Sequence, residues 1–169
     1  MSKLAFIFPG QGAQKAGMGK DFYANSEAAR SFFDQAQKIL DFDLKEMCFG
    51  EHEELNLTEY TQPCMVSVCL AIVQELKKRG INPDITAGLS LGEYAAVAAA
   101  GGMNELDAIK LVRRRGILMQ STVPAGEGAM AAVLGLDAKK IEEILESVEE
   151  WNDDDELLLD IDKMWDVLH

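Results

Sequence analysis

The chain has 169 residues, about the size of one domain, and its 48% hydrophobic and 27% charged residues are typical of a globular protein. The formal net charge of −13 argues against a nucleic-acid binder, which needs a basic surface. Residues 149–169 carry nine acidic residues and one lysine, a net charge of −8, so −5 remains for the first 148 residues. Residues 149–169 are therefore far more acidic than the rest of the chain.

The three cysteines and the apolar runs indicate a compartment. Cys48, Cys64 and Cys69 form no CxxC pair, and we expect small buried thiols in a reducing environment. No apolar run approaches the ~18–20 residues of a membrane span, and Leu4–Phe8 is too short for a signal peptide. We expect a cytoplasmic protein with no membrane or nucleic-acid partner.

The first third of the chain predicts one strand and one helix. Residues 3–8 are a continuous apolar run, typical of a buried parallel strand, and residues 9–12 form a tight loop after it. Ser26 is the predicted N-cap of a helix that ends near residue 40. Residues 41–58 lack a clear period, and we expect a loop-rich segment there.

The middle of the chain alternates helices and strands. A long helix is predicted over residues 61–79, with Pro63 in its first turn. A short strand over 84–88 and an alanine-rich helix over 91–100 follow. Asn104 is the predicted cap of a further helix that reaches about residue 120.

The rest of the chain predicts a strand over 129–135, a helix to about residue 149 capped by Asp137, an acidic linker over 152–156 and an amphipathic helix over 157–168. Strands that alternate with helices predict an α/β fold with a parallel sheet and flanking helices.

The clearest chemical motif is Gly88-Leu-Ser-Leu-Gly92, a GxSxG sequence between a strand and a helix. In this context the turn is strained, the glycines avoid clashes, and the serine hydroxyl is exposed at the carboxyl edge of the sheet. A glycine-flanked serine in an ordinary loop is the alternative. We interpret Ser90 as a nucleophile.

The loop Phe8-Pro-Gly-Gln-Gly12 follows the first strand, and a parallel sheet could place it beside the serine, where a backbone N–H could help to hold an oxyanion. A phosphate loop or a simple turn is the alternative. The dinucleotide motif fails at Lys15 and the P-loop motif fails at Gln14, because both positions need glycine. Nucleotide binding is therefore disfavoured.

Arg113, Arg114 and Arg115 are consecutive on a predicted helix. At about 100° per residue, at most one of them faces the sheet, and we expect the other two in solvent. One inward guanidinium suits the bidentate capture of a carboxylate.

Five motifs in this order resemble the malonyl-CoA:acyl-carrier-protein transacylase family over roughly residues 3–148. They are Phe6-Ile-Phe-Pro-Gly-Gln-Gly12, Thr61-Gln-Pro63, Gly88-Leu-Ser-Leu-Gly-Glu-Tyr94, Arg115-Gly-Ile-Leu-Met119 and Gly128-Ala-Met-Ala-Ala132.

The resemblance implies a role for each matched position. Ser90 would take malonyl from coenzyme A as an ester and pass it to acyl carrier protein in fatty-acid synthesis, although the sequence does not distinguish this from polyketide synthesis. The backbone N–H groups of Gln11 and Leu91 would form the oxyanion hole. Arg115 would pair with the malonyl carboxylate, and Gln62 would line the pocket. Neither a metal nor a cofactor beyond the coenzyme A thioester is implied.

The resemblance also implies a domain plan. Residues 1–127 would be the first part of a large domain with an α/β-hydrolase-like core, and residues 128–149 the first strand and helix of a ferredoxin-like subdomain. The family domain is about twice as long and has its catalytic histidine in the other half. We therefore expect a truncated chain with impaired activity, marginal stability or aggregation.

Three positions depart from the family pattern or leave the base unassigned. Leu89 stands where the family commonly has histidine. His52, in an acidic segment, is interpreted as a surface residue, and nothing supports His169 as the base.

Residues 150–169 are expected to be of foreign origin. The run over 159–169 resembles an uncharacterised bacterial family (YfbM-like) over about eleven residues, and a natural divergent C-terminus is the alternative. For the whole chain, the alternatives to malonyl transfer are an inactive binding fragment and, less favoured because of the inward arginine, an α/β serine hydrolase.

Overall fold

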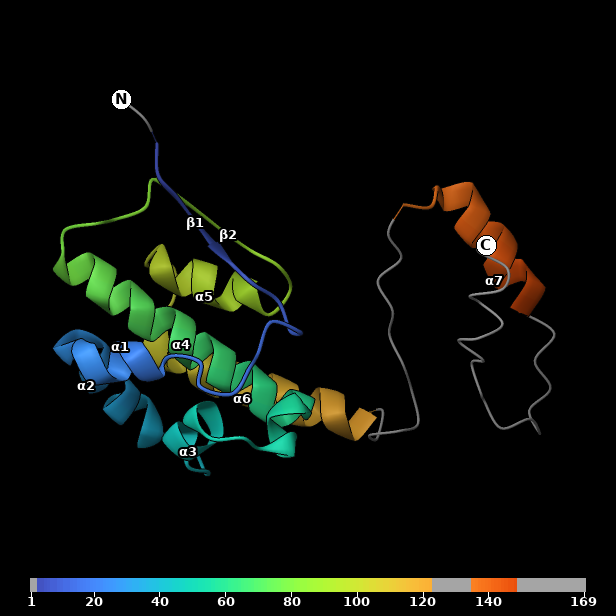
Figure 1. Ribbon diagram of the computed structural model, residues 1–169. Coiled ribbons are helices and arrows are strands. Elements are labelled where there is room, and N and C mark those ends of the chain that lie inside the picture. Colours follow the sequence, from blue (N-terminus) through green and yellow to red (C-terminus); the bar gives the residue numbers. More distant parts are fainter. Residues whose placement is uncertain (1–2, 123–134, 149–169) are drawn as a thin grey trace. The chain divides into compact units, whose positions relative to one another are not determined.

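The computed structural model describes residues 3–122 and 135–148 of the chain (Figure 1). Contacts divide the chain into two units, residues 1–128 and 129–169. The second unit contains helix α7, Ala138–Val148, whose first turn is capped as predicted: the Lys140 backbone N–H donates to Asp137 Oδ1 at 2.9 Å. The strand predicted over 129–135 lies outside the described residues except for its last one, and residues 149–169 lie outside them altogether.

The sheet of the first unit confirms the predicted α/β architecture. Strands β1 (Ala5–Phe8) and β2 (Ile85–Gly88) pair in parallel, with Phe8 opposite Gly88. Parallel strands need a crossover connection, and here the chain between them forms helices. The helix that follows β2, α5 (Gly92–Ala99), packs against both strands. Since both strands end at the same edge, the loops over residues 9–12 and 89–91 start side by side (Figure 1).

The prediction that the first strand is buried is only half right. Phe8 is buried, but Ile7 on the opposite face is 78% exposed, and Ile85 on that same face is 54% exposed. Parallel strands are normally covered on both faces. Within the described residues, helices cover one face only, so an apolar surface stays open to solvent.

That open face predicts how the chain behaves alone. A double variant, Ile7→Thr with Ile85→Thr, should aggregate less than the wild type, because it removes exposed apolar surface. Its free energy of unfolding should change by only about 0.5 kcal/mol. Light scattering and urea titration measure the two effects. Ile109→Thr, which alters a fully buried side chain, should instead cost more than about 2 kcal/mol. Unchanged aggregation in the double variant would contradict the prediction.

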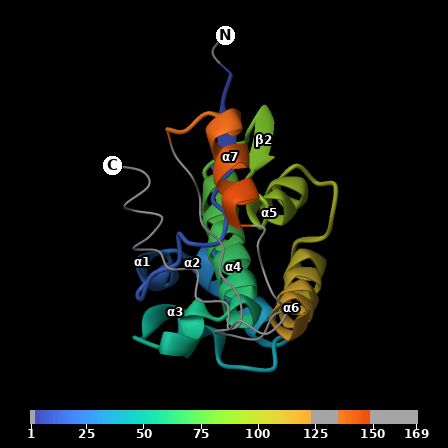
Figure 2. The same ribbon diagram turned by 90° about the vertical axis from the view of Figure 1, so that its right-hand side faces the viewer.

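The helices of the first unit surround one long central helix, α4. Figure 2 shows α1 and α3 on one side of α4 and α5 and α6 on the other. Their bounds are α1 Lys20–Asn25, α2 Glu27–Gln37, α3 Leu44–Phe49, the 3-10 helix η1 Glu53–Asn56, α4 Thr58–Lys78, α5 Gly92–Ala99 and α6 Glu105–Thr122. Eleven residues of α4 are buried, so this helix forms the middle of the core.

The predicted caps are confirmed, and several helix limits are wrong. Ser26 Oγ accepts from the Ala29 N–H, as expected. Asn104 Oδ1 likewise accepts from the N–H groups of Leu106 and Asp107. However, α2 ends at Gln37, and the segment over 41–58 holds α3 and η1. Asp43 caps the start of α3. The apolar pattern of this six-residue helix is too short to have predicted it.

Helix α4 begins three residues before the predicted start, so Pro63 lies inside the helix and not in its first turn. A proline there lacks the N–H that would bond to the carbonyl of Glu59. Arg113 Nη1 donates to that carbonyl at 2.8 Å instead. A side chain of α6 therefore satisfies the acceptor that the proline leaves free.

The cysteines are largely as predicted. Cys48 and Cys64 are buried and Cys69 is half-buried, and all three are free thiols. A hydrogen bond with Cys48 and burial both raise the pKa of the Cys64 thiol, and burial raises the pKa of Cys69 to about 11. The raised pKa values keep the Cys64 and Cys69 thiols protonated at neutral pH, so these two side chains act as packing groups.

Candidate active site

Ser90 lies on a strained bend between β2 and α5. Its φ of +48° is unusual for a residue with a side chain, and no other described residue except glycine has a positive φ. A Cβ on Gly88 would come within 2.1 Å of the backbone of Gly92. The two glycines of the motif thus permit the bend, and the bend leaves Ser90 exposed.

The first loop packs directly against this bend. The Leu89 N–H donates to Phe8 O at 3.1 Å, and a Cβ on Gly92 would lie 2.3 Å from the same oxygen. A Cβ on Gly10 would lie 2.9 Å from Leu89 O, so the loop backbone touches the bend one residue before Gln11.

The two backbone amides predicted for the oxyanion hole are free donors within the described chain. Neither the Gln11 N–H nor the Leu91 N–H donates to another described residue. Backbone N–H groups at an exposed turn or at a helix N-terminus have no partner within the chain and can donate to a ligand. Leu91 itself is buried, which anchors the backbone beside Ser90.

Arg115 reaches the serine from α6. Its Nη2 donates to Ser90 Oγ at 3.3 Å and its Nη1 donates to Gln62 Oε1 at 2.7 Å. The guanidinium also lies 5.6 Å from the ring centre of Tyr94. The structure therefore brings Ser90, Arg115 and Gln62 together, from three elements far apart in the sequence.

The first turn of α4 connects these parts. Thr58 Oγ1 accepts from Gln11 Nε2 at 2.8 Å, and the Thr58 N–H donates to Gln120 Oε1 at 3.1 Å. A Cβ on Gly116 would lie 2.8 Å from Glu59 Cα, so α6 meets α4 backbone to backbone directly after Arg115.

The prediction for the three arginines is wrong at one position. Arg114 is exposed, as expected, but the Arg113 side chain is only 14% exposed and binds Asp41 and Glu59. Arg113 does not face the sheet: it points to the start of α4 and the segment before α3. Helix α6 therefore has a second packed face, toward the start of α4, whereas the prediction assumed that only the side toward the sheet is packed.

The ion pair between Arg113 and Asp41 predicts a pH effect. The hydrogen bond from Arg113 lowers the pKa of Asp41 below its ordinary value of 3.8, so the folded chain binds this proton less readily than the unfolded chain. The contribution to stability is therefore complete above about pH 4 and is lost as the pH falls through the lowered pKa. Because Asp41 is largely exposed, the effect should be at most about 1 kcal/mol.

Urea titration at pH 7 and at pH 3 measures this effect. Asp41→Asn should reduce the loss of stability on acidification. The control is Asp107→Asn, which alters another exposed aspartate, and its loss of stability on acidification should be larger than that of Asp41→Asn. Equal losses in the two variants would contradict the assignment.

No histidine contacts Ser90 within the described residues: Arg115 is the one side chain hydrogen-bonded to Ser90 Oγ there. His52 is partly exposed, in agreement with the predicted surface position, and its Nε2 lies 3.1 Å from Glu46 Oε1. His169 lies outside the described residues. The part of the chain that the structure describes thus places no general base beside the serine.

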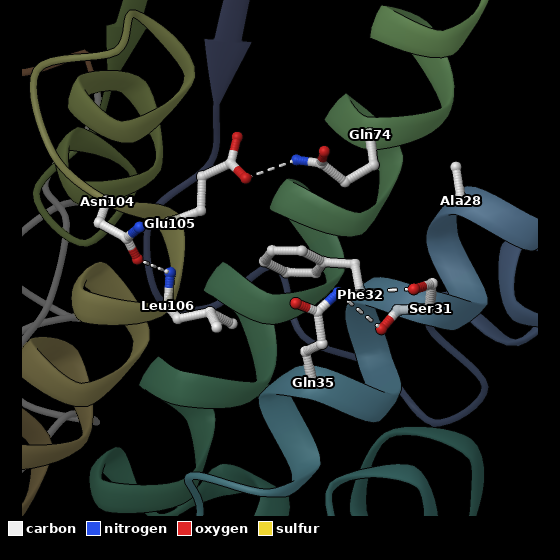
Figure 3. Close-up of a pocket in the computed structure, with 8 residues that line it drawn as sticks. All are labelled: Ala28, Ser31, Phe32, Gln35, Gln74, Asn104, Glu105 and Leu106. Carbon is white, nitrogen blue, oxygen red and sulfur yellow. Dashed lines mark hydrogen bonds between the residues drawn. The ribbon is translucent and has the colours of Figure 1, made fainter.

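A polar pocket of about 370 Å³ lies between α2, α4 and the start of α6 (Figure 3). Gln74 Nε2 donates to Glu105 Oε2 at 2.8 Å, and Lys77 Nζ lies 2.9 Å from the other oxygen of that carboxylate. Its charged and amide groups thus pair with one another. Gln74 is twelve residues beyond Gln62 on α4, about 18 Å along the helix, so the pocket is separate from Ser90.

The described residues offer neither a metal-binding cluster nor a membrane-spanning helix. In residues 3–122 and 135–148 no three histidine, cysteine, aspartate or glutamate side chains cluster as metal ligands would. Among the described helices, none combines the length and apolar character that a bilayer crossing requires.

Sequence reasoning missed three residues of this site: Thr58, Tyr94 and Gln120. Tyr94 lies within the Gly88–Tyr94 motif, so its spacing from Ser90 could have suggested a role. Thr58 and Gln120 act through hydrogen bonds between elements that only the tertiary structure brings together.

Fold and site together define an α/β domain with an exposed serine on a strained strand-to-helix bend and an arginine hydrogen-bonded to it. Residues 5–154, most of the chain, match the acyl transferase domain family. The chain belongs to that family.

The chain is similar to known transacylases in sequence and in structure. The chain is 48% identical over 151 residues to the malonyl CoA-acyl carrier protein transacylase of Bacillus subtilis, an alignment that covers 89% of this chain and 48% of that protein. The structure of the Clostridium perfringens malonyl CoA-acyl carrier protein transacylase matches with a TM-score of 0.78 and 44% identity, over 86% of this chain and 46% of that one.

A further similar structure is a malonyl-transacylase in complex with its type II PKS acyl-carrier protein. It matches with a TM-score of 0.81 and 39% identity, over 88% of this chain and 49% of that one. The chain spans about half the length of the curated relatives it matches.

Proposed function

We propose that this chain carries the serine and carboxylate-binding half of a malonyl transfer site. Ser90 would accept malonyl from malonyl-CoA, and the thiol of acyl carrier protein would receive it. The contact between Arg115 and Ser90 Oγ carries the proposal, because it puts a fixed cation beside the atom to be acylated. A malonyl group has a free carboxylate for that cation, whereas an acetyl group has none.

In the acylation step, Ser90 Oγ attacks the thioester carbonyl carbon. A C–O bond forms, the C–S bond breaks, and the serine proton ends on the coenzyme A thiol. The carbonyl oxygen carries negative charge in the intermediate, and the free N–H groups of Gln11 and Leu91 would stabilise it. The reverse sequence with the carrier thiol as nucleophile regenerates Ser90.

Arg115 would act on the substrate and not on the proton. It would bind the malonyl carboxylate in a fork, and Gln62 Oε1 holds the guanidinium in place for that contact. No cofactor enters these steps, and none is proposed beyond the thioester substrate.

The absence of a histidine contact to Ser90 in the described residues supports a second candidate, a fragment that binds the acyl thioester without turnover. In a comparable serine enzyme, loss of the base costs about 10⁶ in turnover. The serine hydrolase alternative is disfavoured, because neutral esters have no group for Arg115.

The proposed partner is supported by the relative that was solved with its acyl-carrier protein, and by the identity to transacylases. We place the reaction in the cytoplasm, and the three free thiols are in keeping with a reducing compartment.

Incubation with radiolabelled malonyl-CoA followed by acyl carrier protein tests the function. Label that first joins the chain and then moves to the carrier supports transfer. Label that joins the chain and stays there supports the binding fragment with a single slow acylation. If the chain neither takes up label nor binds malonyl-CoA more tightly than acetyl-CoA, both candidates are wrong. The Ser90→Ala chain is the control for covalent labelling.

A further inference from the structure

Arg113 has more partners than any other described arginine. Its Nε and Nη2 donate to the two carboxylate oxygens of Asp41 at 2.9 and 3.0 Å. Its Nη1 donates to the backbone oxygen of Glu59 at 2.8 Å and to Glu59 Oε2 at 3.1 Å. The guanidinium carbon also lies 5.2 Å from the ring centre of Phe42 and 5.0 Å from that of Tyr60.

These contacts fix α6 against the start of α4. Glu59 and Gln62 are three residues apart on α4, and Arg113 and Arg115 are two apart on α6. The pairs Arg113–Glu59 and Arg115–Gln62 therefore cross between the same two helices within about one turn. Gly116, directly after Arg115, lets the backbone of α6 approach that of α4 at Glu59.

We propose that Arg113 is a positioning residue: it fixes the rotation and height of α6 so that Arg115 faces Ser90 and an incoming acyl carboxylate. The inference rests on the proposed function. A cation held in its bound geometry loses little freedom when the carboxylate arrives, so a fixed Arg115 binds it more tightly than a mobile one.

The three consecutive arginines supply a matched test. Arg113→Gln and Arg114→Gln remove the same charge from neighbouring positions, and only the first breaks the contacts to Asp41 and Glu59. Calorimetry of the full chain measures the dissociation constants for malonyl-CoA and acetyl-CoA, and a thermal melt checks the fold. Arg113→Gln should reduce the preference for malonyl-CoA about tenfold, on the scale of one charged hydrogen bond, and Arg114→Gln should leave it unchanged.

A merely structural Arg113 would give a different result. Arg113→Gln would then lower the melting temperature and leave the preference for malonyl-CoA intact, and that outcome overturns the inference. If Arg113→Gln does not fold, Asp41→Asn weakens the same contact from its exposed end and should reduce the preference by a smaller factor. An unchanged preference in a folded Asp41→Asn chain would equally overturn it.

A second readout needs no ligand. The nitrogen-15 NMR resonance of the Arg115 side-chain Nε–Hε should shift toward that of a free arginine in Arg113→Gln and stay in place in Arg114→Gln. If the wild type shows no preference for malonyl-CoA, the proposed function is wrong, and this resonance still decides whether Arg113 positions Arg115. An Arg115 resonance that does not move in Arg113→Gln contradicts the positioning role.

Discussion

An Arg115→Gln chain should lose its preference for malonyl-CoA over acetyl-CoA. The substitution removes the cation that lies 3.3 Å from Ser90 Oγ, and with it the only charged partner that the described site offers an acyl carboxylate. A hydrogen bond to a charged group contributes about 1.5–3 kcal/mol, so the ratio of the two dissociation constants should fall by about 10- to 100-fold.

The control for this variant is Arg79→Gln, at the far end of α4. Arg79 is exposed and pairs with Glu75, so its loss removes the same charge far from Ser90. Calorimetry with both thioesters should show the wild-type ratio for the control. If the Arg115→Gln chain still prefers malonyl-CoA, Arg115 does not bind the malonyl carboxylate.

A Gly92→Ala chain should lose more than about 4 kcal/mol of folding free energy or fail to fold, an exceptional cost for one methyl group. The new Cβ would lie 2.3 Å from Phe8 O and 2.7 Å from Pro9 O, and neither backbone oxygen has room to move without separating the first loop from the bend. The same displacement would carry Gln11 away from Ser90.

Gly102→Ala is the matched control. There the nearest atom to the new Cβ is Cγ1 of the exposed Val97 at 3.1 Å, so the loss should be within about 1 kcal/mol. Urea titration compares the two variants. Equal stability for Gly92→Ala and Gly102→Ala would contradict the close approach of loop and bend.

Local patterns predicted the parts of the site that depend on short-range chemistry. The Gly88–Gly92 motif predicts a tight bend because glycines, which have no Cβ, permit the close backbone approach, and the structure places Ser90 there at a positive φ. Ser26, Asn104 and Asp137 predicted helix starts because their side chains bond to N–H groups two or three residues on.

Features that depend on tertiary contacts were not predictable in the same way. The local pattern predicts Pro63 in a first turn, since nothing local shows that Arg113 satisfies the carbonyl left free one turn earlier. The helical pattern predicts Arg113 in solvent, because its partners Asp41 and Glu59 are far from it in sequence. The apolar composition predicts a buried first strand, although in the described residues only one face of the sheet that contains Ala5–Phe8 is covered.

Peptide mass spectrometry after incubation with malonyl-CoA tests the acylation of Ser90 most directly. The proposed site predicts a mass increase of one malonyl group on the peptide that contains Ser90, absent from the Ser90→Ala chain and much reduced for acetyl-CoA. A malonyl adduct on any other residue, with Ser90 unmodified, would contradict it.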